Sequence, residues 1–370
     1  MPSHFTSLCR AFVLILLSLV SVDGLTSPLS AQFGGGGFFG SAPPRENLFS
    51  QLSVSVDGVL AATDGRAKSV RLWEAQTGQF QRQLEVLPAG VSAVEFSADG
   101  KTLAVGDRDN VIRLYDPQTA QLVQTLRGHT SAPMRLKFSP DSKTIVSGSD
   151  GLIAGKAEHD RAELLVWSCE SGQILRRLPQ SKGFASDLAF LPDGETLLVS
   201  FLPYEVDPAA PDGVQIWNLK SGERTATLKF EPFRARSMAV SPDGKLMAYG
   251  SHGIILLWDI PTRTLLRALP AKGDDLVIKL AFSPDGLSLA SAAARLNGGT
   301  YVLRAWEVAS SHELWQRDFQ RHVLALEFTR DGSAVIAADY ESVRLYDFES
   351  AATRREWFPR GDVLQKTTKD

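Results

Sequence analysis

Residues 237–269 read SMAVSPDGKLMAYGSHGIILLWDIPTRTLLRAL, and this stretch predicts four short strands joined by turns. The first turn is Ser-Pro-Asp-Gly, in which the proline fixes its own φ and Gly244 accepts a positive φ. The third run is almost continuously apolar up to Trp258, which is typical of a strand buried on both faces. The strands expected in this antiparallel meander are 237–240, 246–250, 254–259 and 265–269.

The same turn and a similar aromatic residue recur along the chain. An Asp-Gly or Asp-Ser pair begins at Asp57, Asp99, Asp141, Asp193, Asp243, Asp285 and Asp331. Each pair is followed by an aromatic residue that ends an apolar run: Trp73, Tyr115, Trp167, Trp217, Trp258, Trp306 and Tyr346. Most intervals are about forty to fifty residues, which is the period of propeller blades.

Six further segments follow the strand order of 237–269. They centre on 58–86, 94–126, 136–178, 188–228, 280–319 and 326–358. A four-stranded sheet alone leaves both faces in water, whereas stacking sheets around an axis covers them. The sequence therefore predicts an all-β fold, a seven-bladed β-propeller of four-stranded antiparallel blades.

Two ways of closing the ring stay open at this point. Residues near 353–358 can form the last outer strand, in which case no blade is shared between the two ends of the chain. Alternatively, residues 47–50 can contribute an edge strand to the last blade.

The composition is that of a soluble globular protein, with 44% apolar residues, 22% charged residues and a formal net charge of −3. A nucleic-acid surface would need Lys and Arg clustered on one face, so we expect no nucleic-acid partner. Of the two cysteines, Cys9 lies in the N-terminal segment and Cys169 stands alone in the body, so no internal disulfide is expected.

Residues 1–31 have the pattern of a secretory signal peptide. Arg10 precedes an uncharged apolar run at 11–22, and small and turn-forming residues follow up to Ala31. The run is shorter than the roughly 20 residues that a membrane span needs. We therefore expect an exported protein (periplasmic, extracellular or on the cell surface), and the lack of sequons and disulfides favours a bacterial envelope. The alternative is an uncleaved signal anchor, which is the one way in which we expect a membrane contact.

Three further segments complete the expected organisation. Residues 32–47 are rich in Gly, Phe and Pro without periodicity, which predicts a flexible linker. The propeller is expected over 48–358, and a disordered C-terminal tail over 359–370. Glycines 35, 37 and 40 match the spacing of a dinucleotide fingerprint, but prolines follow where that motif needs a helix, so no nucleotide site is expected.

Several motifs resemble those of the WD-repeat family. They are Phe138-Ser139-Pro140-Asp141, Phe282-Ser283-Pro284-Asp285-Gly286, Arg71-Leu72-Trp73, Leu126-Arg127-Gly128-His129 and the run 255–259. The resemblance covers about 48–358 with degenerate repeats, and a related family such as the surface-layer or quinoprotein-like propellers is the alternative. In the WD-repeat family a structural hydrogen-bond network joins a Gly-His, a Ser, a turn Asp and the Trp. The resemblance implies that the third unit builds this network from His129, Ser147, Asp160 and Trp167.

Three units carry extra residues between their second and third strands, at 149–163, 201–213 and 294–301. Insertions on one face of a repeat array commonly mark a binding face, and Arg, Tyr and Phe are types that carry binding energy at protein interfaces. The resemblance implies that the loops between blades, which include Asp275, share this face. The expected partner-binding residues are His159, Arg161, Phe184, Tyr204, Glu205, Asp207, Phe233, Arg234, Arg236, Arg295, Asn297, Arg321 and His322.

No motif predicts a catalytic, cofactor-binding or metal site. His312-Glu313 opens like a zinc-protease helix motif, but Gln316 stands where the second His is needed. The stretch 147–151 only resembles a nucleophile elbow and lies at the end of an expected strand.

These observations favour an exported, non-enzymatic scaffold that binds a protein or peptide through the loop-bearing face of the propeller. One alternative is an enzyme or cofactor-binding propeller, quinoprotein-like, whose site would need acidic or His side chains from different blades to converge on the central channel. Another alternative is a structural component of the cell surface.

Overall fold

The computed structural model of the chain describes residues 52–55, 58–63, 68–85, 87–149, 162–181, 184–202, 213–229, 237–271, 275–295, 299–339 and 342–357. All described residues belong to the compact unit Glu46–Asp370. The expected signal peptide, linker and C-terminal tail lie outside the described residues.

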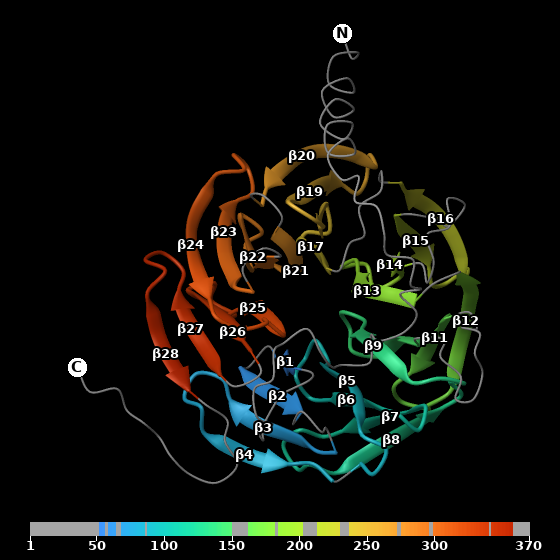
Figure 1. The fold of residues 1–370 in the computed structure, drawn as a ribbon. Coiled ribbons are helices and arrows are strands. Elements are labelled where there is room, and N and C mark those ends of the chain that lie inside the picture. Colours follow the sequence, from blue (N-terminus) through green and yellow to red (C-terminus); the bar gives the residue numbers. More distant parts are fainter. Residues whose placement is uncertain are drawn as a thin grey trace, which may run out of the picture. The chain divides into compact units, whose positions relative to one another are not determined.

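The described residues form seven antiparallel sheets of four strands each, and they contain no helix. Each sheet consists of four consecutive strands, so we number the blades one to seven from the N-terminal side. The sheets stand around a common axis with the first strand of each blade innermost (Figure 1). The expected seven-bladed, all-β propeller is confirmed. In this part of the chain, no helix is long and apolar enough to cross a membrane.

The four positions within a blade are occupied as follows. The inner strands are β1 (Leu52–Val54), β5 (Val91–Phe96), β9 (Pro133–Phe138), β13 (Phe184–Phe190), β17 (Ser237–Val240), β21 (Asp275–Phe282) and β25 (Ala325–Phe328). The second strands are β2 (Val59–Thr63), β6 (Leu103–Asp107), β10 (Thr144–Ser149), β14 (Thr196–Leu202), β18 (Leu246–Gly250), β22 (Ser288–Arg295) and β26 (Ala334–Ala338). The third strands are β3 (Val70–Glu74), β7 (Val111–Tyr115), β11 (Ala162–Ser168), β15 (Val214–Asn218), β19 (Ile254–Asp259), β23 (Tyr301–Glu307) and β27 (Val343–Asp347). The outer strands are β4 (Phe80–Gln83), β8 (Leu122–Arg127), β12 (Ile174–Ser181), β16 (Glu223–Leu228), β20 (Thr264–Pro270), β24 (Glu313–Phe319) and β28 (Thr353–Trp357).

Blade five has the strands that its sequence predicts. Strands β17, β18 and β19 match the expected bounds, and β20 extends the expected outer strand by one residue at each end. The extension follows from the register, which pairs Asp259 with Thr264 and Ile254 with Pro270.

The Ser-Pro-Asp-Gly turn explains why the inner strand of blade five reverses where it does. Ser241 donates its hydroxyl hydrogen to Asp243 Oδ1 at 2.6 Å, and the Lys245 N–H donates to the same oxygen at 3.0 Å. Gly244 has φ +73°, and a Cβ there would lie 2.5 Å from Cδ of Pro192 in the adjacent blade's turn. The glycine is therefore required both by the turn and by the close approach of its neighbour.

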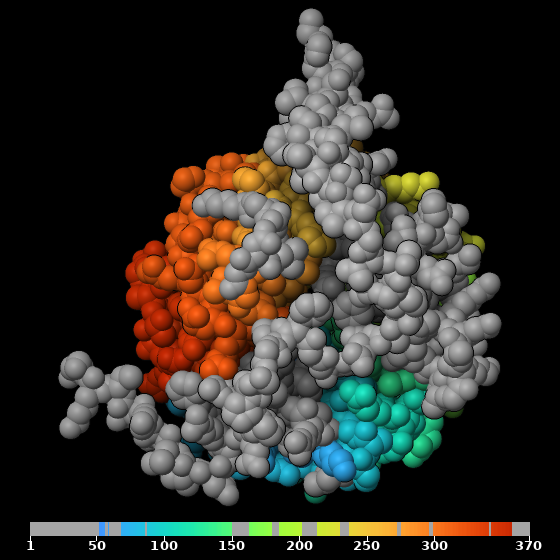
Figure 2. Space-filling model, in the orientation of Figure 1, coloured from blue at the N-terminus to red at the C-terminus, as the bar shows by residue number. Residues whose placement is uncertain are grey.

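Apolar side chains fill the space between neighbouring sheets. Ile255 and Leu257 of blade five pack in one cluster with Val277 and Leu280 of blade six, and similar clusters occupy the other interfaces. Side chains close the gaps that the ribbon leaves between blades six and seven (Figure 2). Burying both faces of every third strand is the main stabilising contribution of this architecture.

The ring closes without exchange of a strand among the described residues. Strands β25 to β28 form the sheet of blade seven, and β1 contacts both β5 and β25. Trp73 of blade one packs with Ile336 and Leu345 of blade seven. The first of the two expected closures is thus the one observed, while residues 47–50 of the second lie outside the described part.

Candidate functional site

Antiparallel strand order places the connections of every blade on two opposite faces. Turns between first and second strands share one face with turns between third and outer strands. The other face, which we call the loop-bearing face, carries the connections between second and third strands and those between blades. The connections β10–β11, β14–β15 and β22–β23 span residues 150–161, 203–213 and 296–300, against 251–253 in blade five. The expected insertions therefore all belong to the loop-bearing face.

Few of the expected binding residues can be placed atom by atom. Nine of them lie outside the described residues: His159, Arg161, Tyr204, Glu205, Asp207, Phe233, Arg234, Arg236 and Asn297. Phe184 begins β13, and only its backbone is described. Arg295, Arg321 and His322 are described, and all three lie at the loop-bearing end of blade six.

The described part of the face has a definite geometry at blade six. Arg295 ends β22, and its Nη1 lies 2.9 Å from Oδ1 of Asp318 on β24. The ring of His322 packs edge-on against Tyr301, with 5.5 Å between ring centroids. Asp275 corrects one expectation, because it begins β21 rather than lying in a loop, and it is buried.

Blade three brings His129, Ser147 and Trp167 together. Ser147 Oγ lies 2.6 Å from His129 Nε2 and accepts a hydrogen bond from Trp167 Nε1 at 2.7 Å. His129 Nδ1 lies 3.1 Å from Oε2 of Glu163, which the sequence analysis did not single out. Asp160, the acid expected in this network, lies outside the described residues.

Two of these hydrogen bonds have a fixed direction. A carboxylate only accepts, so Nδ1 of His129 donates to Glu163. The indole only donates, so Ser147 Oγ accepts from Trp167. Burial acts to raise the pKa of Glu163, but the hydrogen bonds from His129 and from the Thr130 N–H hold that pKa below its ordinary value.

The Ser-His-Glu order imitates a hydrolase triad, but its environment is that of a core. Ser147 is 0% exposed and the His129 side chain is 1% exposed. A nucleophile must reach its substrate, and Ser147 Oγ is enclosed and already bonded to the indole. The network in blade three is therefore structural.

Three other blades bury a carboxylate–arginine pair instead. The pairs are Arg113 with Asp107, Arg304 with Asp275 at 2.7 Å and Arg344 with Asp339 at 3.1 Å. Each arginine precedes the blade's recurrent aromatic residue by two positions. This Arg-x-aromatic spacing was present in the sequence and was the signal that could have revealed the pairs.

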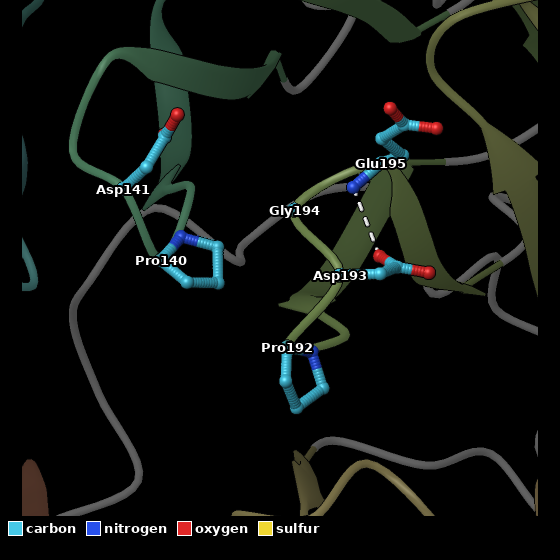
Figure 3. A pocket seen from close by; sticks show the side chains of 6 residues that line it. All are labelled: Pro140, Asp141, Pro192, Asp193, Gly194 and Glu195. Atoms are coloured by element: carbon cyan, nitrogen blue, oxygen red, sulfur yellow. Dashed lines mark hydrogen bonds between the residues drawn. The ribbon is translucent and has the colours of Figure 1, made fainter.

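A pocket of about 420 Å³ lies on the face opposite to the loop-bearing face, between the turns of blades three and four. Its lining consists of Pro140, Asp141, Pro192, Asp193, Gly194 and Glu195 (Figure 3). Asp193 Oδ1 accepts the Glu195 N–H at 2.9 Å, so that carboxylate serves its own turn. In the described part of the chain, no group of three or more His, Cys, Asp or Glu side chains could hold a metal ion.

Comparison with known proteins agrees with this architecture. Residues 81–116, 120–154 and 223–259 match the family model described as WD domain, G-beta repeat. The match 223–259 runs from the outer strand β16 to the third strand β19, so the sequence repeat is offset by one strand from the blade.

Similar stretches occur in curated proteins of several organisms. The chain is 32% identical over 109 residues to WD repeat and SOCS box-containing protein 1 of Takifugu rubripes, which covers 29% of this chain and 24% of that protein. It is 28% identical over 164 residues to small ribosomal subunit protein RACK1y of Oryza sativa subsp. japonica, covering 39% and 46%. It is 27% identical over 135 residues to eukaryotic translation initiation factor 3 subunit I of Scheffersomyces stipitis, covering 36% and 38%. The chain thus spans between about a quarter and about half of these relatives' length.

Seven four-stranded blades around an axis define the class of β-propellers. Within this β-propeller, the three matched segments 81–116, 120–154 and 223–259 are similar to WD repeats.

Proposed function

We propose that the protein is an exported scaffold that binds a protein or peptide partner through the loop-bearing face. The observation that carries the proposal is that the two longest connections, those of blades three and four, both lie on the loop-bearing face. Loops held by a rigid scaffold are the usual place for recognition, because they vary without disturbing the core. Two relatives, the small ribosomal subunit protein and the initiation factor subunit, bear names of components of larger assemblies, which is consistent with a scaffold.

The binding surface is tested by substitutions on both faces of the described blades. Affinity capture from envelope extracts of the source cells is compared between the wild-type chain and the double variant Arg295→Ala, Arg321→Ala. We expect the variant to lose at least about tenfold in the amount of one defined partner, because a central arginine contact is commonly worth more than 1 kcal/mol. The matched control is Lys143→Ala, Lys245→Ala, which changes two cations on the opposite face.

A second set of variants replaces residues 203–212 and 151–160 with short Gly-Ser linkers. The proposal is wrong if capture survives both trimmed loops and the double arginine variant while circular dichroism shows an intact fold. A loss that also occurs in the control with Lys143 and Lys245 substituted would instead place the partner on the opposite face.

Export is a separate part of the proposal and rests on the apolar run at 11–22 after Arg10. Cell fractionation combined with the intact mass of the purified chain tests it. Loss of an N-terminal peptide ending near Gly24 or Ala31 is expected, whereas a full-length chain in the membrane fraction would indicate a retained anchor. Firm association with the cell surface would favour the structural-component alternative.

A further inference from the structure

Besides Asp275, which pairs with Arg304, six charged side chains lie on the inner strands, where the seven blades meet. They are Glu95 on β5, Arg135 and Lys137 on β9, Asp187 on β13, Lys279 on β21 and Glu327 on β25. On β9, Arg135 and Lys137 alternate with Leu136 and Phe138, which pack in the core between blades two and three. Because side chains alternate between the two faces of a strand, the charged groups point away from that cluster.

Contacts across blade boundaries show that these side chains gather around the axis. Lys137 Nζ donates to Glu95 Oε1 of the preceding blade at 2.6 Å. Arg135 Nε donates to the Ser186 carbonyl of the following blade at 2.7 Å, and Asp187 Oδ2 accepts the Met238 N–H at 2.8 Å. Blades three, four and six are not all neighbours, yet the charges of Asp187 and Arg135 affect the pKa of Lys279, after the larger lowering effect of burial. Charged groups on blades that are not neighbours can affect each other's pKa only if they face each other across the axis.

The six groups form two layers along the axis. Glu95, Lys137 and Glu327 each stand one residue before the last residue of their strand, whereas Arg135, Asp187 and Lys279 each stand three residues before it. Two residues along a strand correspond to about 6.6 Å. The layer with Lys279 lies nearer the loop-bearing face, because the inner strands start there. That layer holds two cations and one carboxylate, and the other holds two carboxylates and one ammonium group.

Four of the six groups lack a described ion-pair partner, and two of these, the side chains of Lys279 and Glu327, also lack a described hydrogen bond. Lys137 pairs with Glu95, Arg135 donates to backbone carbonyls and Asp187 accepts from a backbone amide. Neither Lys279 nor Glu327 has a described hydrogen bond or an ion-pair partner within 4.0 Å. Burial lowers the pKa of the Lys279 ammonium and raises the pKa of the Glu327 carboxyl, so burial disfavours the charged form of each group.

Solvent nevertheless reaches this region. The Lys137 side chain keeps 43% of its surface exposed, Lys279 is half-buried and Glu327 is exposed. A small solute can therefore contact the same groups that water contacts.

We propose that the axis between β21 and β25 is a binding site for a small zwitterion with the chemistry of a free α-amino acid. Lys279 receives the carboxylate in the layer nearer the loop-bearing face, and Glu327 receives the ammonium group in the other layer. An anion alone would meet the carboxylate of Glu327, and a cation alone would meet Lys279 and Arg135. A neutral dipolar ligand satisfies both groups and leaves the balance of three cations and three anions unchanged, with charge-assisted hydrogen bonds of about 2.8 Å at both ends.

The test is a titration of the purified full chain with each of the common L-α-amino acids, followed by calorimetry and by ligand-observed NMR. Acetate and methylammonium serve as the two half-ligands. We expect at least one amino acid to bind, and each half-ligand to bind at least about tenfold more weakly. Lys279→Met and Glu327→Gln should each weaken amino-acid binding at least about tenfold.

Matched controls are Lys245→Met and Glu195→Gln, which remove the same charges from exposed turns on the opposite face and should bind as the wild type does. Lys279→Gln is the second variant if Lys279→Met does not fold by circular dichroism. The proposal is overturned if no amino acid binds, if acetate or methylammonium binds as tightly as the best amino acid, or if the axis variants bind like the controls. None of these outcomes depends on a protein partner at the loop-bearing face.

Discussion

The residue two positions before the recurrent aromatic takes part in satisfying the buried carboxylate of several blades. In blades two, six and seven it is an arginine, such as Arg304 before Trp306, whose guanidinium meets a buried aspartate, whereas Arg71 of blade one donates to Gln83. Blade three has Leu165 at this position, and there the buried Glu163 pairs with His129. A buried carboxylate without a partner is strongly unfavourable, so a blade that buries one must supply one of these partners.

A second residue position is constrained by backbone conformation. The fifth residue after each recurrent aromatic has a positive φ, and it is glycine in blades one, three and four. In the other blades this position is taken by Ala120, Arg263, Ser311 and Ala351, with φ between 56° and 63°. A Cβ in the left-handed region costs about 1–2 kcal/mol, so these four turns carry a local strain that glycine would not.

Ser311→Gly should therefore stabilise the protein by about 0.5–1 kcal/mol, since the relieved strain exceeds the roughly 0.4–1 kcal/mol of extra freedom that glycine gives the unfolded chain. Ser311 has φ 63°, and its hydroxyl makes no described hydrogen bond. The measurement is the free energy of unfolding in urea. Ser311→Ala is the control, because it removes the hydroxyl and keeps the Cβ. Equal stability of the glycine and alanine variants would show that the turn is unstrained.

At the scale of elements, the Asp turns and the strands could be predicted from the sequence because they depend on local chemistry. Proline, aspartate and glycine form a turn within a few residues of each other. The continuous apolar run before Trp258 indicates a strand that is buried on both faces. The β-bulge that shifts the register at Trp258 was not predicted, because it depends on how β19 pairs with β20. Similar shifts occur at the aromatic residue of each other blade.

The candidate sites could likewise be predicted only where they depend on the local sequence. The insertions could be located from the sequence, because the number of residues between successive turns is enough to find them. Glu163 was missed, because the register across the preceding insertion cannot be counted from the sequence. The axis charges were missed as a group, since Lys279 and Glu327 are single charged residues in apolar strands until ring closure brings their blades together.

The turn aspartates should make the fold acid-sensitive, and Asp331 is a direct test. The hydrogen bond from Thr329 and those from Ser333 lower the pKa of Asp331 to about 2, against about 3.9 in an unfolded chain. A depressed folded pKa contributes stability that is present above the unfolded value and is lost as the pH falls from about 4 to about 2. Asp331→Asn keeps an acceptor oxygen without titrating, so its stability should fall less steeply over that range.

The comparison uses unfolding free energies at several pH values, with Asp109→Asn as the control. Asp109 is exposed, and its carboxylate accepts no hydrogen bond from the described residues. The control should follow the wild-type curve. Parallel curves for the wild type and Asp331→Asn would show that this carboxylate does not contribute to acid sensitivity.

At the scale of the whole molecule, one interface differs from the others. Six pairs of neighbouring blades are joined by side-chain packing and also by the chain that runs from one outer strand to the next inner strand. Blades seven and one lack such a connection, because β28 completes blade seven and β1 begins blade one. The interface between blades seven and one is held by side-chain packing alone, and it can open while the other six interfaces stay intact. We therefore expect local opening of the ring to start at this interface.

Leu345→Ala tests this expectation, since Leu345 is buried between blades seven and one with Trp73 and Ile336. Truncating a buried leucine costs about 2–5 kcal/mol wherever it lies. The control is Leu198→Ala, which removes a buried leucine between blades four and five. Native-state hydrogen exchange should show accelerated exchange in β1–β4 and β25–β28 for Leu345→Ala, but not for Leu198→Ala, where the chain still links the two blades. If both variants accelerate exchange equally in blades one and seven, closure is no weaker than the covalently linked interfaces, and the ring opens as a unit.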